Sequence, residues 1–204
     1  MPGDAPLTSP GPAGRVVVLN GTSSAGKTTL ATMLQSRLAS DGDCWIVLGI
    51  DDVFLKLPHD WIRLRDWLGA YAEEGIAFET IDGEVERRVG PIGTRTLAAY
   101  RGWVGAAARA GLNVIVDEVL LDESDWIGWQ QELDGLDVTW VRVDIALDAL
   151  EARERERGDR MIGLARSQYD IVHRFPKYDL RVDTGVVDPD SATDAVLELV
   201  RRSR

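Results

Sequence analysis

The chain has 204 residues, of which 45% are hydrophobic and 28% are charged, and this composition is sufficient for one globular domain with a substantial core. Its formal net charge of −11 argues against nucleic acid or anionic membranes as partners, because both are polyanions. No apolar stretch approaches the roughly 20 residues of a membrane-spanning helix, and no signal-peptide pattern opens the chain, so we expect a cytoplasmic protein.

The first residues differ in composition from the rest. Residues 1–14 contain four prolines and three glycines, which predicts a disordered leader. We expect a single domain over residues 15–204, beginning with an apolar strand at 15–19.

A glycine-bounded loop separates this strand from a helical pattern at 29–40, which is the setting of a phosphate-binding P-loop. Backbone N–H groups of such a loop and of the helix start bind phosphate oxygens, and Lys27 adds a positive charge for the β- and γ-phosphates. Thr28 is the expected Mg²⁺ ligand. The predicted ATP-binding residues are Gly21, Thr22, Ser23, Ser24, Ala25, Gly26, Lys27, Thr28 and Thr29.

A second buried strand is predicted at 44–48, and Asp51 and Asp52 follow it. It contains Cys44, the single cysteine, which cannot form an internal disulfide and is expected in the core. A carboxylate at the end of this strand has the right chemistry to accept a proton from a substrate hydroxyl. We assign that role to Asp51; the alternative is that Asp51 only caps a helix or turn.

Residues 53–93 have no clear periodicity but contain five aromatic side chains. Two interpretations stay open. The segment forms either two short helices that cap the core, or an acceptor pocket with aromatic walls.

A helix at 94–110 leads to a third strand at 113–116, which ends in Asp117 and Glu118. An aspartate that closes an apolar strand in a P-loop protein is typical of the acid that holds Mg²⁺. Glu118 could instead orient a water molecule, which would make the protein a regulatory NTPase that hydrolyses ATP.

The C-terminal half continues the alternation, with helices near 123–133, 162–173 and 191–201 and strands at 138–143 and 180–183. Between them, Arg157 and Arg160 belong to a charged segment over about 150–165, which we interpret as a lid whose arginines bind the transferring phosphoryl group. A solvated charged helix is the simpler alternative. The predicted fold is α/β, a P-loop kinase-like parallel five-stranded sheet with helices on both faces.

The ordered set of motifs resembles the chloramphenicol phosphotransferase family. It comprises residues 21–28, Leu48-Gly49-Ile50-Asp51, the strand that ends in Asp117-Glu118, Arg157-Gly158-Asp159-Arg160, Val172-His173, Tyr178-Asp179 and Val182-Asp183-Thr184. The resemblance spans about residues 16–184. Glu118 stands where the family has a second aspartate, Thr22 and Thr28 replace glycine and serine, and residues 53–93 match poorly.

This resemblance implies an ATP-dependent kinase that phosphorylates a primary hydroxyl of the antibiotic, with Asp51 as base and with Arg157 and Arg160 near the phosphates. Chloramphenicol inactivation, and hence antibiotic resistance, is the leading expectation for the acceptor. A kinase for an endogenous metabolite or nucleoside shares the chemistry and differs only in its pocket. The sequence gives no indication of the oligomeric state.

Overall fold

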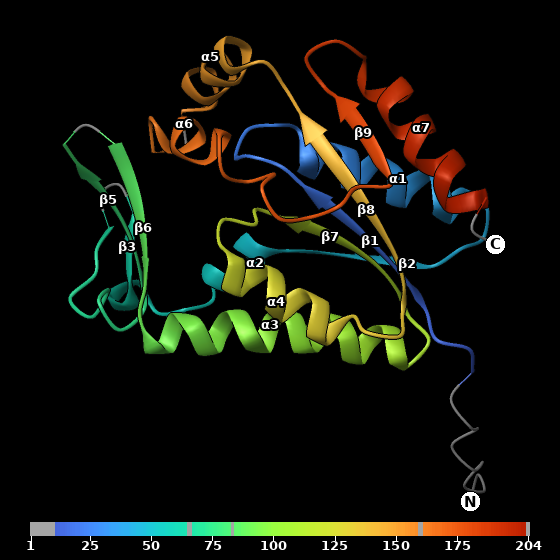
Figure 1. Ribbon diagram of the computed structural model, residues 1–204, viewed down its shortest axis with the longest axis horizontal. Coiled ribbons are helices and arrows are strands. Elements are labelled where there is room, and N and C mark those ends of the chain that lie inside the picture. The colour runs from blue at the N-terminus through green and yellow to red at the C-terminus, as the bar shows by residue number, and fades with distance from the viewer. Residues whose placement is uncertain (1–10, 65–66, 83, 159–160, 203–204) are drawn as a thin grey trace, which may run out of the picture.

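A computed structural model of the protein describes residues 11–64, 67–82, 84–158 and 161–202. Its elements alternate between strands and helices along most of the chain (Figure 1). In chain order they are β1 (Arg15–Asn20), α1 (Lys27–Ser40), β2 (Trp45–Gly49), α2 (Ile50–Phe54), the 3-10 helix η1 (His59–Trp61), β3 (Ile62–Leu64), β4 (Trp67–Leu68), β5 (Ile76–Ile81), β6 (Glu84–Val89), α3 (Pro91–Arg109), β7 (Asn113–Glu118), α4 (Glu123–Glu132), β8 (Asp137–Asp144), α5 (Leu147–Arg157), α6 (Leu164–Tyr169), β9 (Leu180–Asp183) and α7 (Pro189–Arg202).

The main sheet has five parallel strands in the order β2-β7-β1-β8-β9. Helices α1 and α7 cover one face and α3 and α4 cover the other, as Figure 1 shows. The predicted α/β fold with a five-stranded parallel sheet and helices on both faces is therefore confirmed.

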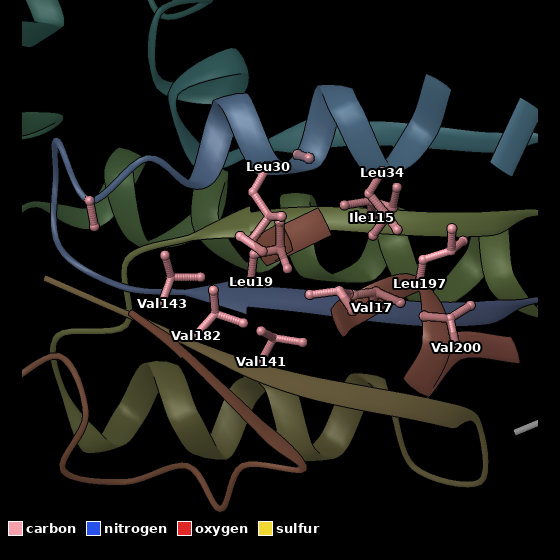
Figure 2. Packing of buried hydrophobic residues seen from close by; sticks show 14 of the residues in the cluster. Val17, Leu19, Leu30, Leu34, Ile115, Val141, Val143, Val182, Leu197 and Val200 are labelled. Carbon is pink, nitrogen blue, oxygen red and sulfur yellow. The ribbon is translucent and has the colours of Figure 1, made fainter. Parts of the chain in front are cut away.

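Both faces of this sheet are buried, and the central strand shows why the sequence forms it. Val17 and Leu19 of β1 contribute to the core under α1 and α7, which Figure 2 shows from close by. Val16 and Val18 point to the opposite face and pack with side chains of α3 and α4. Successive residues of a strand alternate between faces, so an uninterrupted apolar run fits a strand covered on both sides.

Residues 53–93 form a second sheet rather than the two short helices that were one of the two interpretations. This four-stranded sheet has the order β4-β3-β5-β6, and its β5–β6 pair is an antiparallel hairpin. Among the described residues of this segment, only the end of α2 and the three-residue η1 are helical before α3 begins. The two-helix interpretation is wrong because alternating residues, such as buried Val85 between exposed Glu84 and Glu86, favour strand pairing.

Two boundaries also differ from the sequence prediction. Cys44 is exposed, because β2 begins one residue later at Trp45 and Cys44 lies in the connection before it. The helix expected over 162–173 is limited to α6. Of the predicted leader, residues 1–10 lie outside the described residues, and Gly14 N donates to Ala108 O at 2.7 Å.

Replacing Leu34 by alanine tests this core. Leu34 is fully buried between α1 and the sheet, so the truncation leaves a cavity in a packed interior. We expect the free energy of unfolding, measured by urea denaturation, to fall by about 2–5 kcal/mol. The matched Leu112→Ala variant, at a half-exposed position, should change stability by less than about 0.5 kcal/mol. Equal effects at the two positions would contradict this packing.

Candidate functional site

The loop between β1 and α1 is shaped by its glycines. Gly26 has a φ of 91°, in the left-handed region that favours glycine, and immediately precedes the first helical residue, Lys27. A side chain at Gly21 would lie 2.4 Å from Val143 O, so only glycine allows this close approach to β8. The loop therefore turns sharply from the end of β1 into the N-terminus of α1, where unpaired backbone N–H groups attract anions.

Lys27, Thr28 and Asp117 form a cluster at the carboxyl end of the sheet. The buried Lys27 ammonium group donates to Thr22 O at 2.8 Å and lies 3.5 Å from Asp117 Oδ1. Thr28 Oγ1 donates to Asp117 Oδ2 at 2.6 Å. A hydroxyl and a carboxylate oxygen thus stand side by side, and oxygen donors of this kind suit Mg²⁺.

Asp51 and Asp52 lie in the first turn of α2, because β2 ends at Gly49. Asp51 therefore follows the strand, as expected from sequence, and belongs to a helix that was not expected there. Asp52 Oδ2 accepts a hydrogen bond from Gly49 N at 2.8 Å, so Asp52 is the carboxylate that caps the helix. Both carboxylates border the same cavity, and the choice between a catalytic and a capping Asp51 stays a prediction.

Glu118 points away from the cavity into the core between β7 and α4. Only 3% of the residue is exposed, and its carboxylate accepts hydrogen bonds from Trp129 Nε1 at 2.9 Å and from Val119 N at 2.8 Å. Burial raises the pKa of Glu118 to about 7, since a charged carboxylate is poorly solvated there. Glu118 and Asp117 therefore face opposite sides of β7, and Asp117 alone borders the cavity.

Helix α5 is attached to the phosphate-binding loop through a C-terminal segment. Arg153 donates to Thr184 O at 2.7 Å and to Thr184 Oγ1 at 3.1 Å, and Thr184 Oγ1 donates to Ala25 O at 2.8 Å. Arg157, one turn further along α5, also borders the cavity. The other lid arginine predicted from sequence, Arg160, lies outside the described residues.

One cavity of about 920 Å³ brings these groups together. Of the predicted site residues, it is bordered by Ser23, Ser24, Gly26, Lys27, Thr28, Thr29, Asp51, Asp117 and Arg157. Gly21, Thr22 and Ala25 belong to the loop but do not border the cavity. Arg153 and Gln168 border the cavity but were not predicted from sequence as site residues. For Arg153 a signal was available, because it lies one helical turn before Arg157.

The far end of the cavity is apolar. Side chains of the second sheet, α2 and the neighbouring loops form its wall: Phe54, Leu55, Ile62, Leu64, Ile76, Phe78, Val119, Leu121 and Met161. Arg87 of β6, which is paired with Phe78 of β5, also borders the cavity, and its guanidinium donates to Asp122 at 2.7 Å and to Asp125 at 2.9 Å. The two carboxylates offset its charge.

A second, smaller cavity of about 530 Å³ lies beside β8 and β9. His173 borders it and contacts Tyr178 OH at 2.8 Å and Asp144 Oδ1 at 3.3 Å. Burial and the neighbouring arginines, against the attraction of Asp144, lower the pKa of His173 to about 4, so the imidazole is neutral at physiological pH. His173 thus lies apart from the large cavity.

The chain is similar in sequence to one protein family and to proteins that carry its features. Residues 14–201 match the family described as "Chloramphenicol phosphotransferase-like protein". The protein named "Putative O-phosphotransferase MT2714" from Mycobacterium tuberculosis (strain CDC 1551 / Oshkosh) is 32% identical over 180 residues, covering 85% of this chain and 76% of its own length.

Solved structures share the fold at low sequence identity. The Mycobacterium tuberculosis APS kinase CysC, in complex with AMPPNP and APS, matches with a TM-score of 0.66 and 18% identity, covering 94% of this chain and 99% of its own. A gluconokinase from Sinorhizobium meliloti 1021 matches with a TM-score of 0.57 and 15% identity, covering 94% of each chain. Among the described residues, no helix combines the length and the apolar character that crossing a membrane requires.

Glu118→Gln tests the burial of this carboxyl group. The pKa in the folded chain, about 7, exceeds the ordinary value of 4.5, so the folded state holds the proton more tightly than the unfolded state. The stability that this group contributes is therefore lost as the pH rises from about 4.5 to about 7. The free energy of unfolding of the wild type, measured by urea denaturation, should fall by roughly a few kcal/mol between pH 5 and pH 8 relative to that of Glu118→Gln, whose amide does not titrate. Glu123→Gln, at an exposed position, is the control, and its stability should depend on pH as that of the wild type does. If the stabilities of Glu118→Gln and the wild type change with pH in the same way, the burial of a protonated Glu118 is contradicted.

Proposed function

The chain belongs to the chloramphenicol phosphotransferase-like family, and on this premise we propose that it transfers the γ-phosphate of ATP to a hydroxyl group of a small molecule. One observation carries the proposal. A single cavity joins the phosphate-binding loop with Lys27 to the carboxylate of Asp51, and an apolar wall adjoins both. An NTPase needs only the first of these parts, whereas a kinase must also hold an acceptor and exclude water.

The P-loop end of the cavity fits the triphosphate of ATP. The backbone N–H groups at the start of α1 and the Lys27 ammonium group suit a polyanionic triphosphate, and both border the cavity. The kinship of fold with an APS kinase that binds the ATP analogue AMPPNP supports this donor. Thr28 and Asp117 would hold Mg²⁺, which when bound offsets negative charge on the phosphates.

In the proposed reaction, the acceptor hydroxyl oxygen attacks the γ-phosphorus while the bond from that phosphorus to the β–γ bridging oxygen breaks. ADP leaves with the electron pair of the broken bond, and Asp51 accepts the hydroxyl proton. Lys27 and Arg157 stabilise the charge on the phosphoryl oxygens during transfer. Arg160 is assigned the same role, which stays a prediction from sequence.

The segments divide the work between the two substrates. We assign acceptor binding to residues 53–93, because the second sheet supplies Ile62, Ile76 and Phe78 to the cavity wall. The lid role is assigned to residues 150–165 because α5 places two arginines at the cavity. These assignments, within one domain over 15–204 and after a leader over 1–14, are part of the proposal.

The apolar wall favours an uncharged acceptor with substantial apolar surface, and chloramphenicol is the first candidate by family. Phosphorylation would then inactivate the antibiotic. An endogenous metabolite kinase remains the second candidate, but a strongly anionic acceptor is disfavoured because Asp122 and Asp125 already offset the charge of Arg87. A regulatory ATPase that uses Glu118 is disfavoured, since this side chain is buried on the other side of β7.

Incubation of the protein with ATP and Mg²⁺ tests the reaction and the acceptor together. Chloramphenicol and a panel of hydroxylated metabolites and nucleosides are added singly, and products are identified by mass spectrometry. We expect a phosphorylated ester of at least one apolar alcohol. ATP hydrolysis that no member of the panel stimulates would favour the ATPase.

Asp51→Asn tests the base. The amide cannot accept the hydroxyl proton, so we expect the transfer rate to fall by roughly 10²–10⁴-fold while ATP affinity is retained. Asp52→Asn should weaken the cap of α2 by about 0.5–2 kcal/mol and reduce transfer less. Transfer kinetics and ATP titration on both variants make the comparison. Unchanged transfer by Asp51→Asn, or a larger loss with Asp52→Asn, would refute the assignment of Asp51.

A further inference from the structure

Gln168 of α6 is a buried polar side chain at the cavity that the proposed reaction does not use. Only 4% of the residue is exposed, and it borders the cavity beside the phosphate-binding loop. Its Oε1 accepts a hydrogen bond from Ser23 N at 2.7 Å. A backbone N–H can only donate, so this contact fixes which end of the carboxamide is the oxygen.

The orientation of the carboxamide leaves its amino group for another partner. Among residues 11–64, 67–82, 84–158 and 161–202, no group accepts a hydrogen bond from Nε2. Nε2 is also not one of the polar atoms that are sealed from solvent without a partner. The amino group therefore retains access to the cavity, and a primary amide offers two N–H donors there.

Contacts on both sides hold α6 in place. At its start, the buried carboxylate of Glu154 accepts hydrogen bonds from Gly163 N and Ala165 N, each at 2.8 Å. Just after its end, Val172 O accepts a hydrogen bond from Asn20 Nδ2 at 2.8 Å. Because Glu154 belongs to the helix that carries Arg157, the donors of Gln168 and of the lid are fixed relative to each other. A donor that is held before the ligand arrives costs little reorganisation on binding.

We propose that Gln168 binds the γ-phosphate of ATP: Nε2 donates to a γ-phosphate oxygen while Oε1 keeps Ser23 of the phosphate-binding loop in position. The inference rests on ATP as the phosphoryl donor. Gln168 forms no covalent bond and moves no proton. It distinguishes ATP from ADP, because ADP lacks the group that Nε2 contacts.

Gln168→Glu separates the two contacts of this side chain. A carboxylate still accepts from Ser23 N but replaces the donor with a negative charge, which the γ-phosphate repels. Gln168→Met, of similar length, removes both contacts. Gln131→Glu on the exposed surface of α4 is the control for the charge change. Affinities of all four proteins for AMPPNP and for ADP are measured by calorimetry with Mg²⁺ present, after thermal melts that verify folding.

For Gln168→Glu we expect the affinity for AMPPNP to fall by more than about 10-fold and the affinity for ADP to fall by less than about 3-fold. The reason is that the hydrogen bond from Nε2 to the charged γ-phosphate is lost and is replaced by repulsion between two negative charges. Gln168→Met should also lose more affinity for AMPPNP than for ADP, and Gln131→Glu should match the wild type. If Gln168 only supports the loop, both nucleotides lose affinity equally, and this result, or no loss, overturns the proposal.

These outcomes are independent of the acceptor. A wild type that binds AMPPNP but phosphorylates no alcohol refutes the proposed function and leaves the AMPPNP-to-ADP comparison valid. A wild type that phosphorylates an acceptor while Gln168→Glu retains its preference for AMPPNP refutes only the role of Gln168. A wild type that binds neither nucleotide contradicts both.

Discussion

The parallel pairing of β1 with β7 is the constraint on which the site depends. Its register sets Leu19 opposite Asp117, so the phosphate-binding loop leaves the sheet beside that carboxylate. Lys27 and Thr28 then reach Asp117 within 3.5 Å and 2.6 Å. A shift of β1 against β7 would move Asp117 away from the loop and would misplace side chains that are packed closely on both faces of the sheet. The same packing that stabilises the fold therefore fixes the geometry of the candidate donor site.

Much of this framework could be predicted from sequence because its signals are local. Strands β1, β2 and β7 of the main sheet contain uninterrupted apolar runs, and the phosphate-binding loop carries its own glycine spacing. The second sheet was missed, although Asp82-Gly83 between two alternating segments is a hairpin signal. The hydrogen bond from Gly49 N to Asp52 was not predicted, because no helix was expected at residues 50–54.

The rest of the site depends on contacts that no local pattern encodes. The hydrogen bond between Gln168 and Ser23 joins residues 145 positions apart in sequence, and the one between Arg153 and Thr184 joins residues 31 positions apart. Such pairs are set by the packing of α5 and α6 above the sheet. Glu118 is a different case: neighbours on a strand face opposite sides, so the assignment of Asp117 to the cavity already predicts that Glu118 is buried.

In the proposed function, both substrates bind at the carboxyl ends of the parallel strands, ATP beside the main sheet and the acceptor against the second sheet. The central claim is that one cavity holds donor and acceptor together, with Asp51 at the acceptor hydroxyl. A crystal structure of the protein with Mg²⁺, AMPPNP and an alcohol that it phosphorylates in the panel assay tests this most directly. We predict the alcohol hydroxyl within hydrogen-bond distance of the Asp51 carboxylate and facing the γ-phosphate. An alcohol bound elsewhere, or directed away from Asp51, would contradict the account.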